Sequence, residues 1–435
     1  MQDPMPNAFR PGATALPEGE AALVARRQAA LGPAYRLFYE HPLHLVRGEG
    51  VWLYDAGGRA YLDTYNNVAS CGHCHPRIVA AMAEQAGLFA SHTRYLHDRV
   101  LTLAERLLGT MPAEMGHVMF TCTGSEANDL ALRIARAATG GTGVIVTENA
   151  YHGVTASVAE FSPSLGSGVP LGPNVRTVPP PDPRRFAGDA AQGFADAVQA
   201  AIDDLNRHGI RPAVLIVDTI FSSDGVFADP TGVLGPAVAA IRAAGGIFIA
   251  DEVQPGFGRT GAGMWGFSRH GIVPDMISMG KPMGNGYPLA ALALRPEVIA
   301  EFGRNARYFS TFGGNAVAAA VGNAVLDVIA DEGLIENART VGAGFADTLR
   351  DLARQYGWLG QVRAAGLFLG VDVETDGHPD GARAGRLVNG LREEGVLISA
   401  TGPKGHVLKI RPPLTFSADN VTFFAERLER VLRRG

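Results

Sequence analysis

One lysine stands in an unusual setting in the stretch "SMGKPMGNGYP", from Ser278 to Pro288. Glycine, proline and methionine surround Lys281, and the stretch holds no acidic residue that could pair with its ammonium. A buried lysine without a partner is costly, whereas a neutral lysine amine is a nucleophile and a base. Because the apolar run "DMISMG" comes directly before it, we expect Lys281 at the end of a strand, in a chemical role.

A carboxylate follows a second apolar run, in "IFIADEVQPGFGR" from Ile247 to Arg259. In an open α/β sheet, polar residues at the carboxyl ends of strands line the ligand crevice, so Asp251 is expected to face that crevice. A carboxylate that caps a loop, or that pairs with Arg259, explains the pattern equally well.

The stretch "TCTGSEANDLALRIAR", from Thr121 to Arg136, has the features of an anion site. A strand ends, a turn follows, and a strongly helical run begins, so free amides and the positive end of the helix dipole would face a phosphate. Gly124 would let the backbone approach closely, and Ser125 would add a hydroxyl. The alternative is an ordinary helix start with Ser125 as its cap.

Two aromatic side chains follow the strand-like run "GVIV" in "ENAYHG", from Glu148 to Gly153. Tyr151 and His152 would therefore lie at the edge of the same crevice. An aromatic ring there can stack on a flat cofactor, while an aromatic residue of the core is the simpler alternative.

Together these residues indicate one cofactor. An imine-forming lysine, a carboxylate, a phosphate pocket and a stacking ring are what pyridoxal 5'-phosphate requires. We therefore expect an enzyme in which Lys281 and Asp251 are catalytic. A non-catalytic protein that kept the fold is the competing hypothesis, but such a protein is expected to have lost one of these two residues, and both are present.

The elements that position these residues form an α/β pattern. From about residue 76 to 330, near-continuous apolar runs alternate with alanine-rich helices, which predicts a large domain with a mostly parallel sheet covered on both faces. Residues 331–435 are expected to form a smaller α+β domain, packed with an N-terminal arm and hairpin in residues 1–75. Helices are predicted over Glu18–Leu31, Glu126–Ala138, Val233–Ala244, Ala316–Asp331, Asn337–Gln355 and Ala418–Arg433.

The composition restricts the partners. The chain has 435 residues, of which 46% are hydrophobic, and a net charge of -5, so neither nucleic acid nor a membrane is an expected partner. Three cysteines form no disulfide framework, and the cytoplasm is the predicted location. The stretch "SCGHCHP", from Ser70 to Pro76, resembles a zinc site, but four ligands within five residues strain a tetrahedral geometry. No metal is therefore expected.

From about residue 35 onward the chain resembles the class III aminotransferases, which are fold-type-I pyridoxal-phosphate enzymes. The motifs are "GHCHP", "TGSEANDLALRIAR", "YHG", "IADEVQPGFGRTG", "GKPMGNGYP" and "STFGGNAVAAAVG". The resemblance implies that Lys281 forms the imine, Asp251 faces the pyridine nitrogen, and Gln254 lies near the phenolic oxygen. It also implies that Tyr151 covers the ring, with His152 and Asp218 nearby, and that Gly124 and Ser125 hold the phosphate. Thr311 would reach the phosphate of a neighbouring subunit, which implies a homodimer.

Further stretches are similar to the branch that contains alanine-glyoxylate aminotransferase 2 and the phosphoethanolamine phospholyases. We expect an aminotransferase that moves an amino group from an amine or amino acid to a keto acid, with ammonia-phospholyase activity on an O-phospho-amine as the alternative. Arg94, Arg411 and Asn67 are candidate substrate residues, although each arginine could equally form an ion pair on the surface or between domains. In "VLIVDTIFSSDGVFADP", from Val214 to Pro230, Asp218 stands where this class usually has glutamate, so the substrate is not inferred from a relative.

Overall fold

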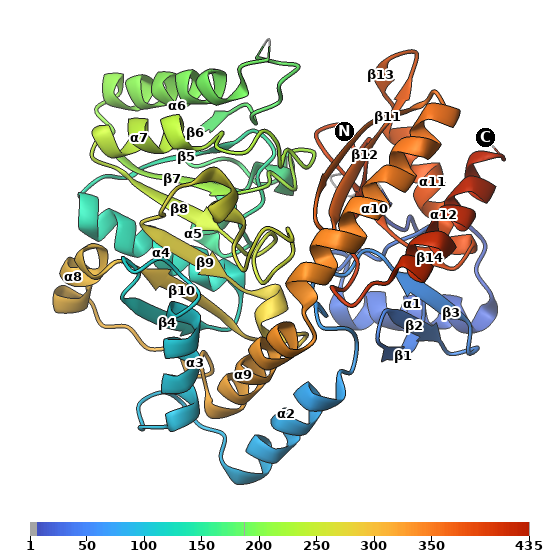
Figure 1. Ribbon diagram of the computed structural model, residues 1–435, viewed down its shortest axis with the longest axis horizontal. Helices are drawn as coiled ribbons and strands as arrows, with labels where there is room; N and C mark the ends of the chain where they lie inside the picture. The colour runs from blue at the N-terminus through green and yellow to red at the C-terminus, as the bar shows by residue number, and fades with distance from the viewer. Residues whose placement is uncertain (1–6, 187, 435) are drawn as a thin grey trace.

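A seven-stranded sheet forms the centre of the larger lobe, at the left of Figure 1. The computed structural model describes residues 7–186 and 188–434. The strand order is β4-β10-β9-β8-β7-β5-β6, and only β10 among the described strands of this sheet runs antiparallel to its neighbours. The strands are β4 (His117–Thr121), β5 (Gly143–Thr147), β6 (Val175–Val178), β7 (Pro212–Asp218), β8 (Ile247–Asp251), β9 (Met276–Met279) and β10 (Ala290–Leu294). The predicted mostly parallel sheet is confirmed.

Both faces of this sheet are covered, as the near-continuous apolar runs predicted. Along β7, Leu215 and Val217 join one hydrophobic cluster, and Val214 and Ile216 join another, because successive strand residues point to opposite faces. The first cluster includes helices α3 (Asp98–Leu108), α6 (Ala190–Arg207), α7 (Gly235–Ala243) and α9 (Ala316–Asp331). The second includes α4 (Gly124–Thr139), α5 (Ala156–Ala159) and α8 (Pro296–Asn305).

The smaller lobe, at the right of Figure 1, is formed by segments from both the N-terminal and the C-terminal parts of the chain. Strand β3 pairs in parallel with β14, so the N-terminal hairpin extends into a C-terminal segment. The strands of these two sheets are β1 (Leu45–Glu49), β2 (Trp52–Asp55), β3 (Ala60–Asp63), β11 (Leu359–Ala365), β12 (Phe368–Thr375), β13 (His378–Pro379), β14 (Val396–Leu397), β15 (Ser399–Thr401) and β16 (Val407–Ile410). Its helices include α10 (Leu334–Gln355), α11 (Gly381–Glu393) and α12 (Ala418–Leu432), while α2 (Pro76–Leu88) packs on α9.

Several predicted elements differ from the observed ones. Helix α7 begins at Gly235 instead of Val233, and α10 begins at Leu334 instead of Asn337. The apolar stretch "GVLISA", from Gly395 to Ala400, divides at Ile398 into β14 and β15, which belong to different sheets. Helix α4 begins at Gly124 instead of Glu126, because the Thr123 side chain caps it by accepting from the Glu126 amide. Helix α9 has the predicted bounds, and the Asn315 carboxamide caps it by accepting from two backbone amides.

Residues of the smaller lobe donate hydrogen bonds to backbone carbonyls of the segment 222–226, which belongs to the larger lobe. The carbonyl of Ser223 accepts from the Thr401 hydroxyl (3.2 Å) and the Gly402 amide (3.2 Å). The Arg363 Nε donates to the carbonyls of Gly225 (3.0 Å) and Val226 (3.1 Å). We call these bonds the 222–226 clamp.

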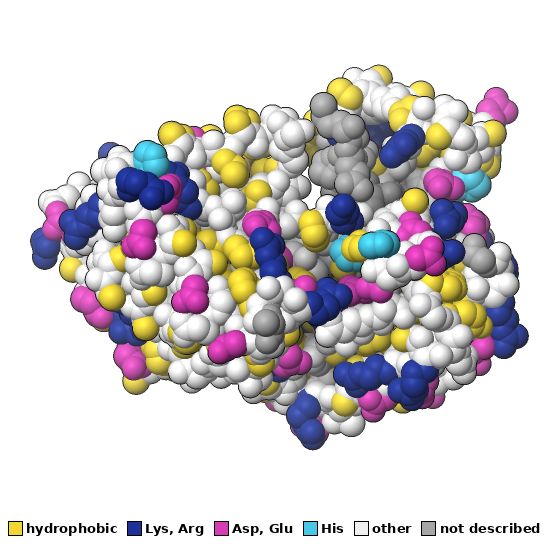
Figure 2. Space-filling view, turned by 90° about the horizontal axis from the view of Figure 1, so that it is seen from above, with side chains coloured by type: hydrophobic (Ala, Val, Ile, Leu, Met, Phe, Trp, Pro, Cys, Tyr) yellow, Lys and Arg dark blue, Asp and Glu magenta, His cyan; other side chains and the backbone are white. Residues whose placement is uncertain are grey.

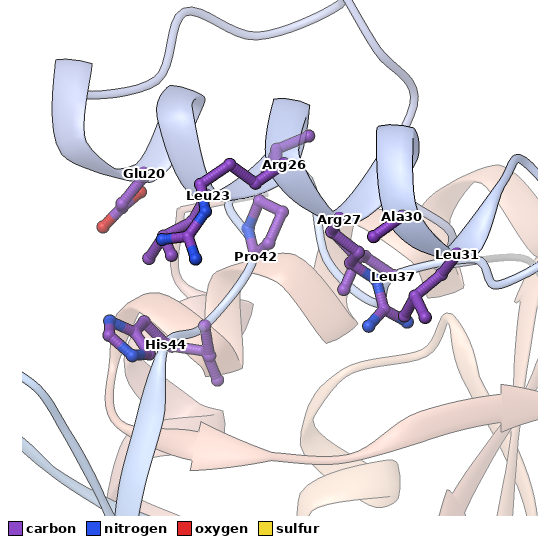
Figure 3. A pocket seen from close by; sticks show the side chains of 11 residues that line it. Glu20, Leu23, Arg26, Arg27, Ala30, Leu31, Leu37, Pro42 and His44 are labelled. Atoms are coloured by element: carbon purple, nitrogen blue, oxygen red, sulfur yellow. The ribbon is translucent and has the colours of Figure 1, made fainter.

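The N-terminal arm lies against the smaller lobe through few contacts. Helix α1 (Glu18–Leu31) has the predicted bounds but no buried residue. A groove of about 460 Å³ separates it from the segment that includes Leu37, Pro42 and His44 (Figure 3). The Tyr39 hydroxyl fixes that segment by donating to the Ile398 carbonyl (3.0 Å). Residues 1–6 of the expected arm lie outside the described residues.

On the face shown in Figure 2, acidic and basic side chains are interspersed. Within the described ranges, no helix has the length and apolar composition needed to cross a bilayer.

Candidate active site

The candidate residues meet at the carboxyl ends of three adjacent strands. In the sheet register Asp218 lies beside Asp251, and Asp251 lies beside Ser278. Lys281 follows three residues later, in a 3-10 turn over Lys281–Gly284. Both carboxylates and the lysine therefore come together at the sheet edge where the sequence predicted the crevice.

Lys281 is largely buried and has an unusual backbone, with φ of 33°. Burial and the positive charge of Arg411 lower the pKa of its amine to about 8, against the opposing charges of Asp251 and Asp218. Among the described residues none accepts a hydrogen bond from its amine. A neutral amine without a protein partner is suited to attack a carbonyl carbon.

Asp251 is buried and accepts hydrogen bonds from three donors. These are His152 Nδ1 (2.7 Å), Asn128 Nδ2 (2.9 Å) and the Val253 amide (3.1 Å). Pairing with Arg259, the alternative left open above, does not occur. The fully buried Arg259 instead donates to the backbone carbonyls of Leu367 (3.0 Å) and Pro412.

The position of a proton on His152 follows from its surroundings. Its Nδ1 faces the Asp251 carboxylate, and its Nε2 is buried without a partner among the described residues. Because a carboxylate oxygen accepts, the Nδ1 atom carries a proton and donates to Asp251.

Asn128 is a residue of this site that the sequence analysis did not identify. It lies on the buried face of α4 and donates to both Asp251 and the His152 carbonyl (2.8 Å). The available signal was its position, because an asparagine on an inward face between Ala127 and Leu130 must find hydrogen-bond partners.

The start of α4 has free donors for an anion. Thr123 caps the helix, so the interpretation of Ser125 as the cap is wrong. The Ser125 hydroxyl oxygen instead accepts from the Val154 amide (3.1 Å), which leaves its hydrogen free to donate. In the part of the chain that the structure describes, the amides of Gly124 and Ser125 have no acceptor. A Cβ at Gly153 would lie 2.4 Å from the Ser125 hydroxyl oxygen, so this turn requires glycine.

Gln254 is held by two donors from the smaller lobe and the N-terminal region. Arg411 Nη1 (2.6 Å) and Asn67 Nδ2 (3.1 Å) both donate to its Oε1. Asn67 also donates to the Gln254 carbonyl (2.9 Å), and Arg411 Nε donates to the Tyr65 carbonyl (2.8 Å). The structure thus brings together Gln254, Arg411 and Asn67.

Asp218 lies beside Asp251 in the sheet and also stabilises the turn that follows it. Its carboxylate caps the following turn by accepting from the amides of Ile220 (3.1 Å) and Ser222 (3.1 Å). Burial raises the pKa of this carboxyl group, and the charge of Asp251 raises it further.

Lys409 was also missed. It is buried, with its Nζ 5.6 Å from the centre of the Phe368 ring. Burial, assisted by the charge of Arg411, lowers the pKa of its amine well below the usual value, while the charge of Asp218 opposes this shift.

Three candidate residues are exposed to solvent. The Tyr151 ring is 40% exposed, and burial of the rest, together with the Asp251 charge, raises the pKa of its hydroxyl. Thr311 is exposed. Arg94 is also exposed, with its guanidinium 3.7 Å from the centre of the Phe309 ring and no ion pair among the described residues.

The Cys and His residues of "SCGHCHP" point to separate partners. His73 Nε2 bonds to Asp63 (2.7 Å) and His75 Nε2 to Glu332 (2.9 Å), while Cys71 is buried and Cys74 exposed. Across the described part of the chain, no group of three or more His, Cys, Asp or Glu side chains could hold a metal ion.

The arrangement fits pyridoxal 5'-phosphate. The free amides at the start of α4 suit its phosphate, the buried Asp251 suits a protonated pyridine nitrogen, and the unbonded amine of Lys281 suits its aldehyde. The model of one protein family, described as aminotransferase class-III, matches residues 38–432. The chain belongs to the class III aminotransferases.

The relatives of this aminotransferase include both activities named above. An alanine-glyoxylate aminotransferase 2-like protein of Drosophila melanogaster is 37% identical over 415 residues, covering 92% of this chain and 84% of that protein. The structure of a phospholyase from Arthrobacter in complex with phosphoethanolamine is 43% identical, with a TM-score of 0.91, covering 94% of this chain and 99% of that one. The ornithine aminotransferase of Toxoplasma gondii, solved with PLP at partial occupancy, is 26% identical, with a TM-score of 0.81, covering 95% of this chain and 94% of that one. Like other class III aminotransferases, this enzyme uses pyridoxal phosphate.

Proposed function

We propose that this enzyme moves an amino group from an amine or amino acid donor to a keto acid acceptor. The observation that carries the proposal is the convergence of Lys281, Asp251 and the free amides of α4 at one crevice. Pyridoxal phosphate, when bound, supplies the electron sink that lets the donor lose its α-proton. Membership of the class III aminotransferases supports this reaction.

Each residue has a distinct task in this proposal. The amine of Lys281 would hold the cofactor's aldehyde carbon and would carry the proton removed from the donor. Asp251, fixed by Asn128 and His152, would accept a hydrogen bond from a protonated pyridine nitrogen. The Ser125 hydroxyl and the amides beside it would donate to the phosphate, and the Tyr151 ring would stack on the cofactor. Asn67 would hold Gln254 in place by donating to its Oε1 (3.1 Å).

We also propose that the enzyme forms a homodimer. Thr311 and Arg94 both lie on the surface of their own subunit. The Arg94 guanidinium lies over the ring of Phe309, two residues before Thr311. This location is consistent with Thr311 reaching the neighbouring subunit's phosphate. The cytoplasmic location inferred from the three cysteines, all of them free, remains a prediction.

A two-step absorbance experiment tests the proposal. An amino donor added alone should convert the bound cofactor to its amine form and remove the visible band, and a keto acid such as pyruvate, glyoxylate or 2-oxoglutarate should restore it. The Lys281→Ala variant should lack the starting band. If no keto acid restores the band after donor treatment, aminotransfer is excluded.

Phospholyase activity is the second candidate, because the Arthrobacter relative that was solved with phosphoethanolamine is 43% identical. In this reaction phosphate and ammonia leave an O-phospho-amine without any keto acid. Phosphate release from phosphoethanolamine in the absence of a keto acid would establish it, and absence of release would dismiss it. The two assays share one enzyme preparation, so they distinguish the activities directly.

A further inference from the structure

The turn that carries Lys281 has an unusual backbone and a single hydrogen-bonded link to the rest of the protein. Lys281 opens the turn with φ of 33°, a conformation that costs energy and persists only where the surroundings impose it. The backbone hydrogen bonds of the turn are local, such as that from the Asn285 amide to the Pro282 carbonyl (3.1 Å). Within the described part of the chain, the Asn285 side chain alone forms hydrogen bonds from residues 281–287 to other segments.

The Asn285 carboxamide bonds at both of its ends to one loop. Its Oδ1 accepts from the Cys71 amide (2.8 Å), and its Nδ2 donates to the Gly72 carbonyl (2.9 Å). Because a carbonyl cannot donate and an amide N–H cannot accept, only this orientation of the carboxamide satisfies both partners. Residues 70–73, which we call the 70–73 loop, begin the motif "SCGHCHP", so this motif contains the partner of the lysine turn.

The 70–73 loop is in turn fixed to the smaller lobe. The His73 amide donates to the Gly50 carbonyl (2.7 Å), and the Gly50 amide donates to the His73 carbonyl (3.1 Å), which joins the loop to the turn between β1 and β2. From the C-terminal part of the chain, the Leu414 amide donates to the Ser70 carbonyl (2.7 Å). The lysine turn of the larger lobe is therefore connected to a loop that the smaller lobe holds in place.

The other end of the lysine turn lies against the start of α4. A Cβ at Gly280 would lie 3.4 Å from the Gly124 amide nitrogen, so the orientation of the turn sets how far the Lys281 amine lies from the amides expected to hold the phosphate. The Met283 side chain is fully buried, and packing fixes this part of the turn. The end at Asn285 depends on its two side-chain hydrogen bonds.

We propose that Asn285 is a positioning residue for Lys281. By tying the end of the lysine turn to the 70–73 loop, it holds the amine where the aldehyde of the bound cofactor lies. There the amine adds to the aldehyde carbon, a C=N bond forms and one water molecule leaves. This inference rests on the proposed function, in which Lys281 holds that carbon, and it adds the residue that keeps the lysine in place.

The test compares two forms of the cofactor by isothermal titration calorimetry on the cofactor-free enzyme. Pyridoxal phosphate can form the bond to Lys281, whereas pyridoxine 5'-phosphate has a hydroxymethyl group in place of the aldehyde and cannot. In Asn285→Gly both side-chain bonds are lost, while glycine adopts the φ of 44° found at this position without strain. The dissociation constant of pyridoxal phosphate should increase about tenfold, because the amine is no longer held, and that of pyridoxine 5'-phosphate should change by less than about twofold.

Asn389→Ala is the matched control. Asn389 lies on α11 and has the same pair of bonds, because its Oδ1 accepts from the Glu40 amide (2.9 Å) and its Nδ2 donates to the Gly385 carbonyl (3.0 Å). None of these residues belongs to the lysine turn or to the 70–73 loop. Both variants should lower the melting temperature, but Asn389→Ala should leave both dissociation constants unchanged.

The proposal is overturned if both dissociation constants of Asn285→Gly increase by the same factor, or if neither changes, because Asn285 would then support only the fold. If Asn285→Gly does not fold, Asn285→Asp decides, since its carboxylate still accepts from the Cys71 amide but cannot donate to the Gly72 carbonyl. A loss of affinity for pyridoxal phosphate that exceeds the loss for pyridoxine 5'-phosphate by about threefold or more supports the proposal, and a smaller difference refutes it. An unmutated enzyme that binds both forms equally would instead refute the role of Lys281 in the proposed function, so the two failures are distinguishable.

Discussion

Replacement of Asn128 by alanine should weaken cofactor binding more than it weakens the fold. Asn128 lies outside the crevice surface and touches the proposed cofactor site only through Asp251 and the His152 carbonyl. Its side chain is 1% exposed, so water cannot readily replace the lost donor. The effect on the cofactor is therefore an effect on the carboxylate that faces the pyridine nitrogen.

The magnitude follows from the bond that is lost. The 2.9 Å contact from Asn128 Nδ2 to the Asp251 carboxylate is a hydrogen bond to a charged group, worth about 2 kcal/mol. If the whole of it serves to hold Asp251 against the pyridine nitrogen, cofactor affinity falls by about 30-fold, at about 1.4 kcal/mol per factor of ten. The unpaired His152 carbonyl adds a cost to folding of about 1 to 3 kcal/mol, which does not depend on the cofactor.

The assay combines the dissociation constant of pyridoxal phosphate, from the absorbance of the bound form, with the melting temperature of the cofactor-free protein. Asn323→Ala is the matched control, because Asn323 Nδ2 likewise donates to two acceptors, which here are the backbone carbonyls of Arg99 (3.0 Å) and Ala319 (2.9 Å). Both variants should melt at lower temperature, and only Asn128→Ala should bind the cofactor weakly. Equal cofactor affinities, within twofold, for the two variants would refute the reasoning, since Asn128 would then only support the fold.

Three further predictions concern protonation and assembly. The rate at which pyridoxal phosphate enters the cofactor-free enzyme should rise with pH and level off above about 8, because only the neutral Lys281 amine reacts; a midpoint near the ordinary 10.5 would contradict this. Burial raises the pKa of Asp224 from 3.8 to about 7, so this carboxyl destabilises the fold increasingly as pH rises from about 4 to 7. Asp224→Asn should therefore gain up to about 4 kcal/mol in free energy of unfolding by urea at pH 8 and little at pH 4, and equal gains at both values would count against the assignment. Mixed dimers of Lys281→Ala and Thr311→Ala subunits should be more active than either parent if Thr311 crosses to the partner, whereas activity no higher than that of the parents would show that it does not.

The sheet and the crevice could be predicted from the sequence because both depend on local patterns. Strands covered on both faces are apolar at every position, and such runs are visible without knowledge of their neighbours. Lys281 and Asp251 each follow a run of this kind, so their meeting at one sheet edge followed from the rule for carboxyl ends of parallel strands.

The residues that orient this chemistry could not be predicted, because their partners lie far away along the chain. Asn128 and Asp251 are 123 positions apart, and Gln254 and Arg411 are 157 positions apart. No local pattern shows that Arg411 lies against Gln254 and the Tyr65 carbonyl. Lys409 was overlooked because no local pattern in "VLKIRPP" shows that its lysine is buried; in the structure it is 6% exposed, with its Nζ 5.6 Å from the centre of the Phe368 ring.

The alternative interpretation of Ser125, as the cap of α4, is wrong for a more local reason. Thr123 and Ser125 are both good caps, and the two positions differ only in which one starts the helix. The reciprocal bonds between Thr123 and Glu126 decide in favour of Thr123 and release the Ser125 hydroxyl.

The 222–226 clamp has a consequence for engineering. Because the carbonyls of Ser223, Gly225 and Val226 are bonded by Thr401, Gly402 and Arg363, the segment that follows Asp218 is shaped by distant parts of the chain. If residues 218–228 were replaced by those of a relative with another substrate, the new segment would lack the strands that fix its backbone conformation in that relative. New substrate ranges in this fold should therefore be easier to obtain by exchanging the segment together with β11 and β15 than by exchanging a single loop.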